Sequence, residues 1–363
     1  MLGASVGESA SKISATNFPL FLDEQRSRNL LSWKDGAEIL GSMYVDERAS
    51  YLPGRPCGGS ADEPCPTLAD AFGGSHLLKS TDYEVRIRPG VYRASENVGF
   101  VFTDSSISLK RWPEESEQRV VFDCEHGPAS FAFKDCSASS LTGIELRHCP
   151  TVLVAGSTGF TVTDAHFLDG KPLAPTDSRL ARRNVAQSAA MTGGSALMVT
   201  HTTGLVVQDS VFVNHTARPG GALFVDASEG VQLRRLQIRS GGGIFIAACK
   251  DKTTLSDATL IACSSGGKGS AIHVVGSELV VQRVAITPNK RTSVRCEGQA
   301  SVIDVDGTLL LSKACTNSDT NRPHSERDTR LSSAPQNVAH AAVVLVMFIL
   351  GLNWVLEGLE ARW

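Results

Sequence analysis

The chain has 363 residues, 42% of them hydrophobic, which is enough for one large domain or two ordinary ones with a substantial core. This apolar content excludes a chain that is disordered throughout. The formal net charge is −3 and the basic residues are scattered, so the sequence has no electrostatic footprint for nucleic acid, and we exclude that class of partner.

Residues 1–42 precede the regular part of the chain. They do not begin with a basic segment that leads into a continuous apolar run, so no secretory signal peptide is visible. Apolar side chains within residues 22–40, among them Leu30, Leu31 and Leu40, have the spacing of an amphipathic helix. We expect this helix to cap the repeat body, because an uncapped end exposes unpaired strand edges.

From residue 43 the pattern becomes one of short strands and turns. After a first strand at residues 43–46, a loop rich in Gly and Pro contains Cys57 and Cys65, which would form a disulfide in an oxidising compartment. A short helix is expected to begin at Pro66. Within residues 85–92 we expect a strand that ends in a tight Pro-Gly turn. Further strands are expected at residues 100–102, 107–109 and 120–122.

A repeated motif, in which Gly is followed by alternating apolar residues, occurs through the second half of the chain. It starts at Gly193, Gly220, Gly241 and Gly269, at intervals of 27, 21 and 28 residues. Further short apolar runs follow each start, with no helix between them. Three short strands per repeat indicate a solenoid whose coils stack through parallel ladders. We therefore predict an all-β parallel β-helix over residues 43–312, with about ten coils of ~22–25 residues.

The clearest copy of the repeat is residues 211–225. Phe212 is expected to fill the coil interior and Asn214 to lie at a corner, while Gly220 and Gly221 turn the chain into the next strand. Asn214 also begins an Asn-His-Thr triplet, the acceptor pattern for N-glycosylation. The alternative is an asparagine whose amide bonds the next coil, and the sequence leaves both open.

The order of motifs along the chain resembles the opening coils of pectin-lyase-like right-handed parallel β-helix proteins. The motifs are Tyr44-Val-Asp, Cys57-Gly-Gly-Ser, Pro64-Cys-Pro-Thr-Leu-Ala-Asp-Ala, Val85-Arg-Ile-Arg-Pro-Gly-Val-Tyr and Val120-Val-Phe-Asp-Cys. Phe212-Val-Asn-His with Gly220-Gly-Ala-Leu is similar to the repeat of polymorphic outer membrane proteins, Phe-x-x-Asn with Gly-Gly-Ala-(Ile/Leu). Here Asn214 follows Phe212 by two positions instead of three. The resemblance covers residues 43–311.

Many proteins of the first family cleave acidic polysaccharides, so the resemblance raises the question of catalysis. Lyases of that class use clustered Asp ligands for Ca²⁺ and an Arg base, and hydrolases use paired Asp carboxylates. The acids of this chain that lie next to turns are single and not paired. At turns, Asp commonly forms a hydrogen bond with its own backbone. These acids are Asp164, Asp209 and Asp226. The isolated histidines are expected on the surface or in turns; they are His201, His215 and His273. We therefore assign no catalytic residue, cofactor or metal ligand.

The nine cysteines leave at least one unpaired, and no pair has the C-x-x-C spacing of a zinc site. Those in or beside apolar runs are expected to be small buried hydrophobic residues; they are Cys124, Cys136, Cys149, Cys249 and Cys263.

The C-terminal part of the chain changes character twice. Residues 313–336 are polar and predict a linker. Residues 337–356 carry no formal charge, and as a helix they would span ~30 Å, the thickness of a bilayer core. We therefore predict that this segment is a transmembrane helix. There are two alternatives: a cleaved lipid-anchor signal, with Ser332-Ser-Ala as the attachment region, or a helix packed on the end of the solenoid. Residues 357–363 form a charged tail.

These features predict a non-catalytic, membrane-tethered β-helix protein displayed on the cell surface, with an adhesion, glycan-binding or spacer role. Its expected partners are the membrane, through the C-terminal helix, and a carbohydrate or other cell-surface ligand. A lyase or glycoside hydrolase of the pectin-lyase-like class is the alternative. A third hypothesis is an intracellular scaffold, which a native Cys57–Cys65 disulfide would contradict.

Overall fold

A computed structural model describes residues 42–50, 57–93, 96–125, 130–170, 196–215, 220–263, 271–287, 293–312 and 314–315, all within one compact unit. Within these ranges no helix has the length and apolar character needed to cross a bilayer. The expected cap at residues 22–40, most of the linker and the hydrophobic segment at residues 337–356 lie outside the described residues.

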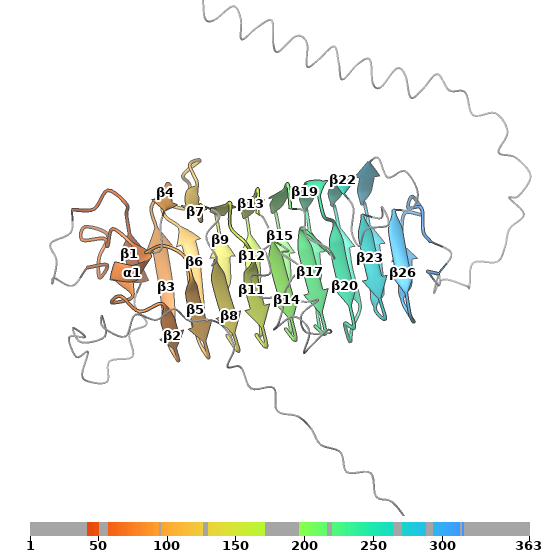
Figure 1. The fold of residues 1–363 in the computed structure, drawn as a ribbon, viewed down its shortest axis with the longest axis horizontal. Helices are drawn as coiled ribbons and strands as arrows, with labels where there is room; N and C mark the ends of the chain where they lie inside the picture. Colours follow the sequence, from red (N-terminus) through yellow and green to blue (C-terminus); the bar gives the residue numbers. More distant parts are fainter. Residues whose placement is uncertain are drawn as a thin grey trace, which may run out of the picture. The chain divides into compact units, whose positions relative to one another are not determined.

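The described residues form a parallel β-helix with three sheets (Figure 1). Sheet 1 contains β1 (Ser42–Val45), β3 (Asp82–Ile87), β6 (Ser106–Arg111), β9 (Ser140–Thr142), β12 (Thr161–Thr163), β15 (Val206–Gln208), β18 (Gln232–Arg234), β21 (Thr253–Ser256), β24 (Glu278–Gln282) and β27 (Ser301–Asp304). Sheet 2 contains β2 (Leu77–Lys79), β5 (Phe100–Thr103), β8 (Phe131–Lys134), β11 (Val152–Ala155), β14 (Leu197–Thr200), β17 (Leu223–Asp226), β20 (Ile244–Ala247), β23 (Ile272–Val275) and β26 (Val294–Glu297). Sheet 3 contains β4 (Gly90–Arg93), β7 (Val120–Asp123), β10 (Ile144–Arg147), β13 (His166–Leu168), β16 (Val211–Val213), β19 (Gln237–Gly241), β22 (Thr259–Cys263) and β25 (Ala285–Thr287).

Each coil visits sheet 2, then sheet 1, then sheet 3. The described strands make eight complete coils, from β2–β3–β4 to β23–β24–β25, with β1 before them and β26–β27 after them. This is slightly fewer than the ten predicted, because some coils are longer than the predicted repeat. The ladder partners Val152 and Leu197 are 45 positions apart, whereas Leu223 and Ile244 are 21 apart. Parallel crossovers of this kind wind right-handed in nearly all proteins, as the resemblance implies.

The interior of the coils is apolar because alternate strand residues point inward. Because the strands pair in register, side chains of the same type stack on one another in successive coils. The rings of Phe102 and Phe133 have centroids 5.0 Å apart, and those of Phe167 and Phe212 are 4.7 Å apart with planes only 2° from parallel. Full burial of such a side chain contributes about 1.5–3 kcal/mol. Phe212 thus occupies the interior position that its repeat predicts.

Most strands end at a residue with positive φ, which bends the chain into the next sheet. Asp164, Asp209 and Asn214 have φ of 51°, 52° and 59°, and Asp and Asn adopt this left-handed conformation more readily than most residues. The residue after each of them is buried, as Ser210 and His215 are. At such a corner the strand ends, the next residue adopts the left-handed conformation, and the side chain of the residue after it points into the interior.

Two local predictions need correction or refinement. The strand expected within residues 85–92 is β3, which ends before the Pro-Gly turn as predicted, and the residues after Pro89 form a second strand, β4. Proline has no N–H to donate to a ladder, so it commonly ends a strand. The expected helix is the four-residue α1 (Leu68–Ala71), whose N-cap Thr67 accepts a hydrogen bond from the Asp70 N–H.

The Gly220-Gly221 turn leads into β17. Gly220 has a φ of +65°, and a Cβ on Gly221 would lie 2.5 Å from the backbone oxygen of His215 and 2.7 Å from Cα of Gly242. The backbones of His215, Gly221 and Gly242 therefore approach too closely to leave room for a side chain at residue 221. This packing is a structural reason for glycine at this turn.

Candidate functional site

The first coils place aromatic and basic side chains together on the outer face of sheet 1. We call Tyr44, Arg86, Arg88, Lys110 and Trp112 the aromatic–cation cluster. Tyr44 of β1 is the ladder partner of Arg86 in β3, which is in turn the partner of Lys110 in β6. Partners in a ladder point to the same face, and the residues next to them, such as Val45 and Val85, are buried inside.

The cluster is held by ring contacts. The rings of Tyr44 and Trp112 meet edge to face, with centroids 5.3 Å apart. The guanidinium carbon of Arg86 lies 5.6 Å from the Tyr44 ring centroid, and that of Arg88 lies 5.1 Å from the Trp112 centroid. Such cation–π contacts contribute about 0.5–1 kcal/mol each at exposed sites. Arg86 Nη1 also donates a hydrogen bond to the Tyr44 hydroxyl at 3.1 Å.

Acidic residues fix the orientation of these cations. Glu84 accepts from Arg86 Nε at 2.7 Å and lies 3.0 Å from Lys110 Nζ, and Arg88 pairs with Asp46 at 2.9 Å. Partial burial alone would raise the pKa of Glu84, but the hydrogen bonds from Arg86 and Lys110 outweigh it and lower that pKa. The side chains of Arg86 and Arg88 remain 31% and 43% exposed. Part-exposed Tyr, Trp and Arg are the residue types enriched in recognition surfaces.

A second group lies on the outer face and at the edge of sheet 3. We call Asp123, Glu145, Arg147, His148 and His166 the histidine–carboxylate cluster. Glu145 of β10 is the ladder partner of His166 in β13, and Arg147 is the partner of Asp123 in β7. His166 Nδ1 lies 3.6 Å from Glu145 Oε2, Arg147 Nε bonds the same carboxylate, and His148 Nδ1 lies 2.8 Å from Asp123 Oδ1.

Both carboxyl groups of this cluster have pKa values below the usual range. The interaction with the His166 imidazole is the largest cause of the lowered pKa of Glu145, against the effect of burial, since only 7% of this side chain is exposed. Burial favours a higher pKa for Asp123, and the His148 hydrogen bond is the main interaction that outweighs it. A carboxylate can orient an imidazole for acid–base work. Neither carboxyl group has the raised pKa of a glycosidase general acid.

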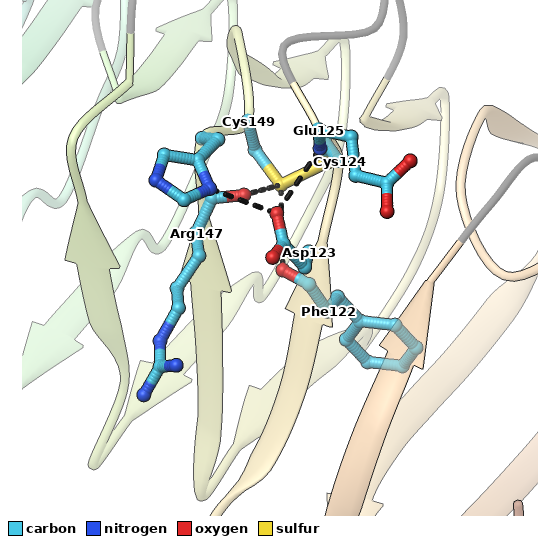
Figure 2. Close-up of a disulfide and its surroundings, with 7 residues drawn as sticks. Phe122, Asp123, Cys124, Glu125, Arg147 and Cys149 are labelled. Atoms are coloured by element: carbon cyan, nitrogen blue, oxygen red, sulfur yellow. Dashed lines mark hydrogen bonds and ion pairs between the residues drawn. A yellow bond between two sulfur atoms is a disulfide. The ribbon is translucent and has the colours of Figure 1, made fainter.

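A disulfide joins Cys124 to Cys149 beside this cluster (Figure 2). Both are buried, as expected, but they form a disulfide and are not the small unbonded hydrophobic residues that the sequence predicted. They occupy the same corner of adjacent coils, 25 positions apart, where the Cys124 N–H donates to the Arg147 carbonyl at 3.0 Å. Figure 2 also shows Glu125 next to Asp123, whose Oδ1 accepts from the Glu125 N–H at 3.1 Å.

The structure contains two further disulfides. Cys57 and Cys65, paired from their shared loop in the sequence, are joined at an S–S distance of 2.01 Å, and Cys296 is joined to Cys315. The Cys124–Cys149 pair could have been predicted from the sequence, because the separation of the two cysteines falls within the range of coil lengths. The remaining described cysteines are buried, as expected; they are Cys136, Cys249 and Cys263.

Of the three single acids, Asp226 has a hydrogen bond with the backbone of the next residue, Ala227, whereas Asp164 and Asp209 form ion pairs with arginines. Asp164 pairs with Arg119 at 2.6 Å, and Asp209 pairs with Arg235 of the next coil at 2.5 Å. Asp226 ends β17 on another face, and burial raises its pKa. The ion pairs of Asp164 and Asp209 depend on how the coils align with one another. The number of residues between the partners in the sequence did not reveal them.

The predicted corner residue Asn214 is exposed, and its Nδ2 donates to Asp169 Oδ1 at 2.8 Å, so its amide bonds the preceding coil and not the next one. The expectation of surface histidines holds for His201 but is wrong for His215 and His273, which are buried. The left-handed residue before His215 turns that side chain inward. Across the part of the chain that the structure describes, no three His, Cys, Asp or Glu side chains converge as metal ligands.

No family model matches the chain, and no curated protein matches its sequence. Several solved structures resemble it, among them the following two. The endo-xylogalacturonan hydrolase from Aspergillus tubingensis is 9% identical, over 73% of this chain and 82% of that chain, with a TM-score of 0.35. The pectate lyase Pel9A is 11% identical, over 77% of each chain, with a TM-score of 0.30. The fold assignment rests on the strand pairing described above: the chain contains a parallel β-helix with three sheets.

Proposed function

We propose that this protein is an extracytoplasmic β-helix that binds a carbohydrate at the aromatic–cation cluster without cleaving it. The observation that carries the proposal is the edge-to-face pair of Tyr44 and Trp112, flanked by Arg86 and Arg88. A saccharide has an apolar face of C–H groups and a rim of hydroxyls. Aromatic rings pack against the first, and charged hydrogen-bonding groups bind the second.

The sulfur chemistry supports the proposed compartment. Three disulfides within the described residues support a location where thiols are oxidised, and they argue against the intracellular scaffold. In this proposal residues 337–356 anchor the chain in a membrane, and the β-helix is displayed outside the cytoplasm.

Titration calorimetry of the full chain against neutral and uronate-containing oligosaccharides tests the binding proposal. Because anchor residues at interfaces contribute about 2 kcal/mol or more, Trp112→Ala should weaken binding by roughly 30-fold. Trp112→Phe should retain part of the affinity, and Val91→Ala, an exposed residue of sheet 3, should retain all of it. Equal affinity for Trp112→Ala and the parent chain, or no binding by any oligosaccharide, would refute the proposal.

Membrane fractionation tests the anchor separately. The full chain should require detergent for extraction, whereas a chain ending at residue 336 should be recovered without it. Release of the full chain into the soluble fraction without detergent would exclude the anchor.

A second candidate function, cleavage of an acidic polysaccharide, is favoured by the two carboxylate–imidazole pairs of the histidine–carboxylate cluster. Assays for unsaturated uronides and for new reducing ends, on pectin and alginate with and without Ca²⁺, distinguish the two functions. The binding proposal expects no product. Products that disappear in His166→Ala, while Arg239→Ala remains active, would establish the enzyme in its place.

A further inference from the structure

The Cys57–Cys65 disulfide closes a short loop that lies along the edge of β1 opposite to β3. Every residue of this loop is described, and its two ends bond β1. The Tyr44 N–H donates to the Gly58 carbonyl at 2.9 Å, and the Tyr44 carbonyl accepts from the Cys65 N–H at 2.8 Å. The Asp46 N–H donates to the Cys65 carbonyl at 2.8 Å. The loop therefore stands in for a strand beside the first strand of sheet 1.

Both backbone groups of Tyr44 are bonded to the loop. A residue has one N–H and one C=O, so the bonds between β1 and β3 come from the residues on either side of Tyr44. The Val45 carbonyl, for example, accepts from the Arg88 N–H at 2.8 Å. Without the loop, β1 would be an edge strand with these groups of Tyr44 unpaired. The position of Tyr44 thus depends on the loop.

The two residues that bond the loop also shape the aromatic–cation cluster. The ring of Tyr44 meets the Trp112 ring at 5.3 Å between centroids, and its hydroxyl accepts from Arg86 at 3.1 Å. The carboxylate of Asp46, with only 10% of its side chain exposed, pairs with Arg88 at 2.9 Å. A displacement of the β1 backbone would therefore move one ring of the cluster and the partner of one of its cations.

We propose that the Cys57–Cys65 disulfide is a redox switch for the binding site. While the disulfide is intact, the loop fixes Tyr44 and Asp46, and the aromatic–cation cluster binds its saccharide. When a dithiol reductant opens the disulfide, the loop loosens from β1 and the cluster binds weakly. This inference rests on the proposed carbohydrate binding and adds its regulation.

The reaction is a thiol–disulfide exchange. A thiolate of the dithiol attacks the Cys57 sulfur, because Cys57 is only half-buried, and the sulfur of the buried Cys65 leaves as a thiolate. The second thiol of the dithiol then displaces Cys57 from the mixed disulfide. Two electrons pass from the dithiol to the Cys57–Cys65 bond. The dithiol becomes a disulfide, and its two protons end on the two cysteine sulfurs.

The size of the effect follows from the length of the loop. Cys57 and Cys65 are 8 positions apart. The loop entropy of a cross-link over this length favours the closed loop roughly 60-fold. The affinity falls in proportion to the fraction of molecules in which the loop stays closed. Because the hydrogen bonds to β1 still favour the closed loop after reduction, we expect the affinity to fall by roughly 3- to 60-fold.

Titration calorimetry of the full chain, against the same neutral and uronate-containing oligosaccharides, tests the switch with and without dithiothreitol. Cys57→Ser/Cys65→Ala should bind roughly 3- to 60-fold more weakly than the oxidised parent chain and should not respond to dithiothreitol. Cys296→Ser/Cys315→Ser, which removes the disulfide beside β26, should bind like the parent and keep the response. A loss of less than about threefold in Cys57→Ser/Cys65→Ala would overturn the switch.

The switch and the carbohydrate proposal fail in different ways. If the oxidised parent chain binds no oligosaccharide, the carbohydrate proposal fails and the switch fails with it. If the oxidised parent binds and Trp112→Ala binds roughly 30-fold more weakly, the carbohydrate proposal holds. Unchanged affinity in Cys57→Ser/Cys65→Ala would then reject the switch alone.

Hydrogen exchange shows whether the loss of affinity is local. In Cys57→Ser/Cys65→Ala, the Tyr44 and Asp46 amides should exchange faster than in the oxidised parent chain. The Gly156 amide, which donates to the Thr200 carbonyl at 3.0 Å in a later coil, should keep its protection. Unchanged protection at Tyr44, or equal acceleration at Tyr44 and Gly156, would contradict a switch that acts through the loop.

Discussion

Replacement of Gly221 by alanine tests the packing of the β16–β17 corner. A Cβ there would lie 2.5 Å from the His215 oxygen, 2.7 Å from Cα of Gly242 and 2.9 Å from its N, and all three are backbone atoms. Gly221 has no positive φ, so alanine adds no dihedral strain. Overpacking against backbone destabilises by about 1–3 kcal/mol. Disruption of the hydrogen bond from Gly242 to His215 adds about 0.5–1.5 kcal/mol.

We expect Gly221→Ala to lower the free energy of unfolding by about 2 kcal/mol, and Gly221→Val to lower it further. Urea unfolding at pH 7.5, with an unchanged m value, measures this change. Gly59→Ala is the matched control, because no atom lies within 4 Å of a Cβ at that position, and we expect a change within about 0.5 kcal/mol. A Gly221→Ala chain as stable as the parent would show that the corner relaxes freely and would refute this reasoning.

Three further predictions concern the core, a disulfide and a surface ion pair. Phe212→Ala should destabilise by about 3–5 kcal/mol in urea unfolding, because the ring is fully buried against Phe167, and a loss below 1 kcal/mol would contradict that packing. Joint replacement of Cys124 and Cys149 by serine should lower stability by about 3.5 kcal/mol, the loop entropy for their separation of 25 positions, and equal stability of both chains would argue against the bond. Arg235→Gln should leave the urea midpoint unchanged, since its pair with Asp209 is exposed and screened, and a clear drop would contradict this.

The repeat body was predictable because its signals are local. Alternation places Phe212 inside, and glycine starts such as Gly220 and Gly241 mark successive coils directly. These features depend on side-chain period and turn chemistry, both of which are written in a few consecutive residues.

The surface clusters were not predictable because they depend on how long each coil is. Ser42 pairs with Glu84, 42 positions later, while Asp82 pairs with Ser106, only 24 positions later. Loops set these lengths, so no fixed interval brings Tyr44, Arg86 and Trp112 together in the sequence. His215 was misplaced for a related reason. The left-handed Asn214 before it reverses the simple alternation and sends the next side chain inward.

The three disulfides bear on how the solenoid comes apart. Each coil is stabilised by its neighbours, and the first and last coils of the described body have one coil as neighbour within the described residues, so we expect them to open first. Cys57–Cys65 lies beside β1, and Cys296–Cys315 ties β26 to the chain that follows the last described coil, so both ends are stapled where unravelling begins. Reduction would release these ends and bare strand edges that template pairing with other chains. We therefore expect the redox state of the surroundings to govern how firmly both ends of the described β-helix hold together.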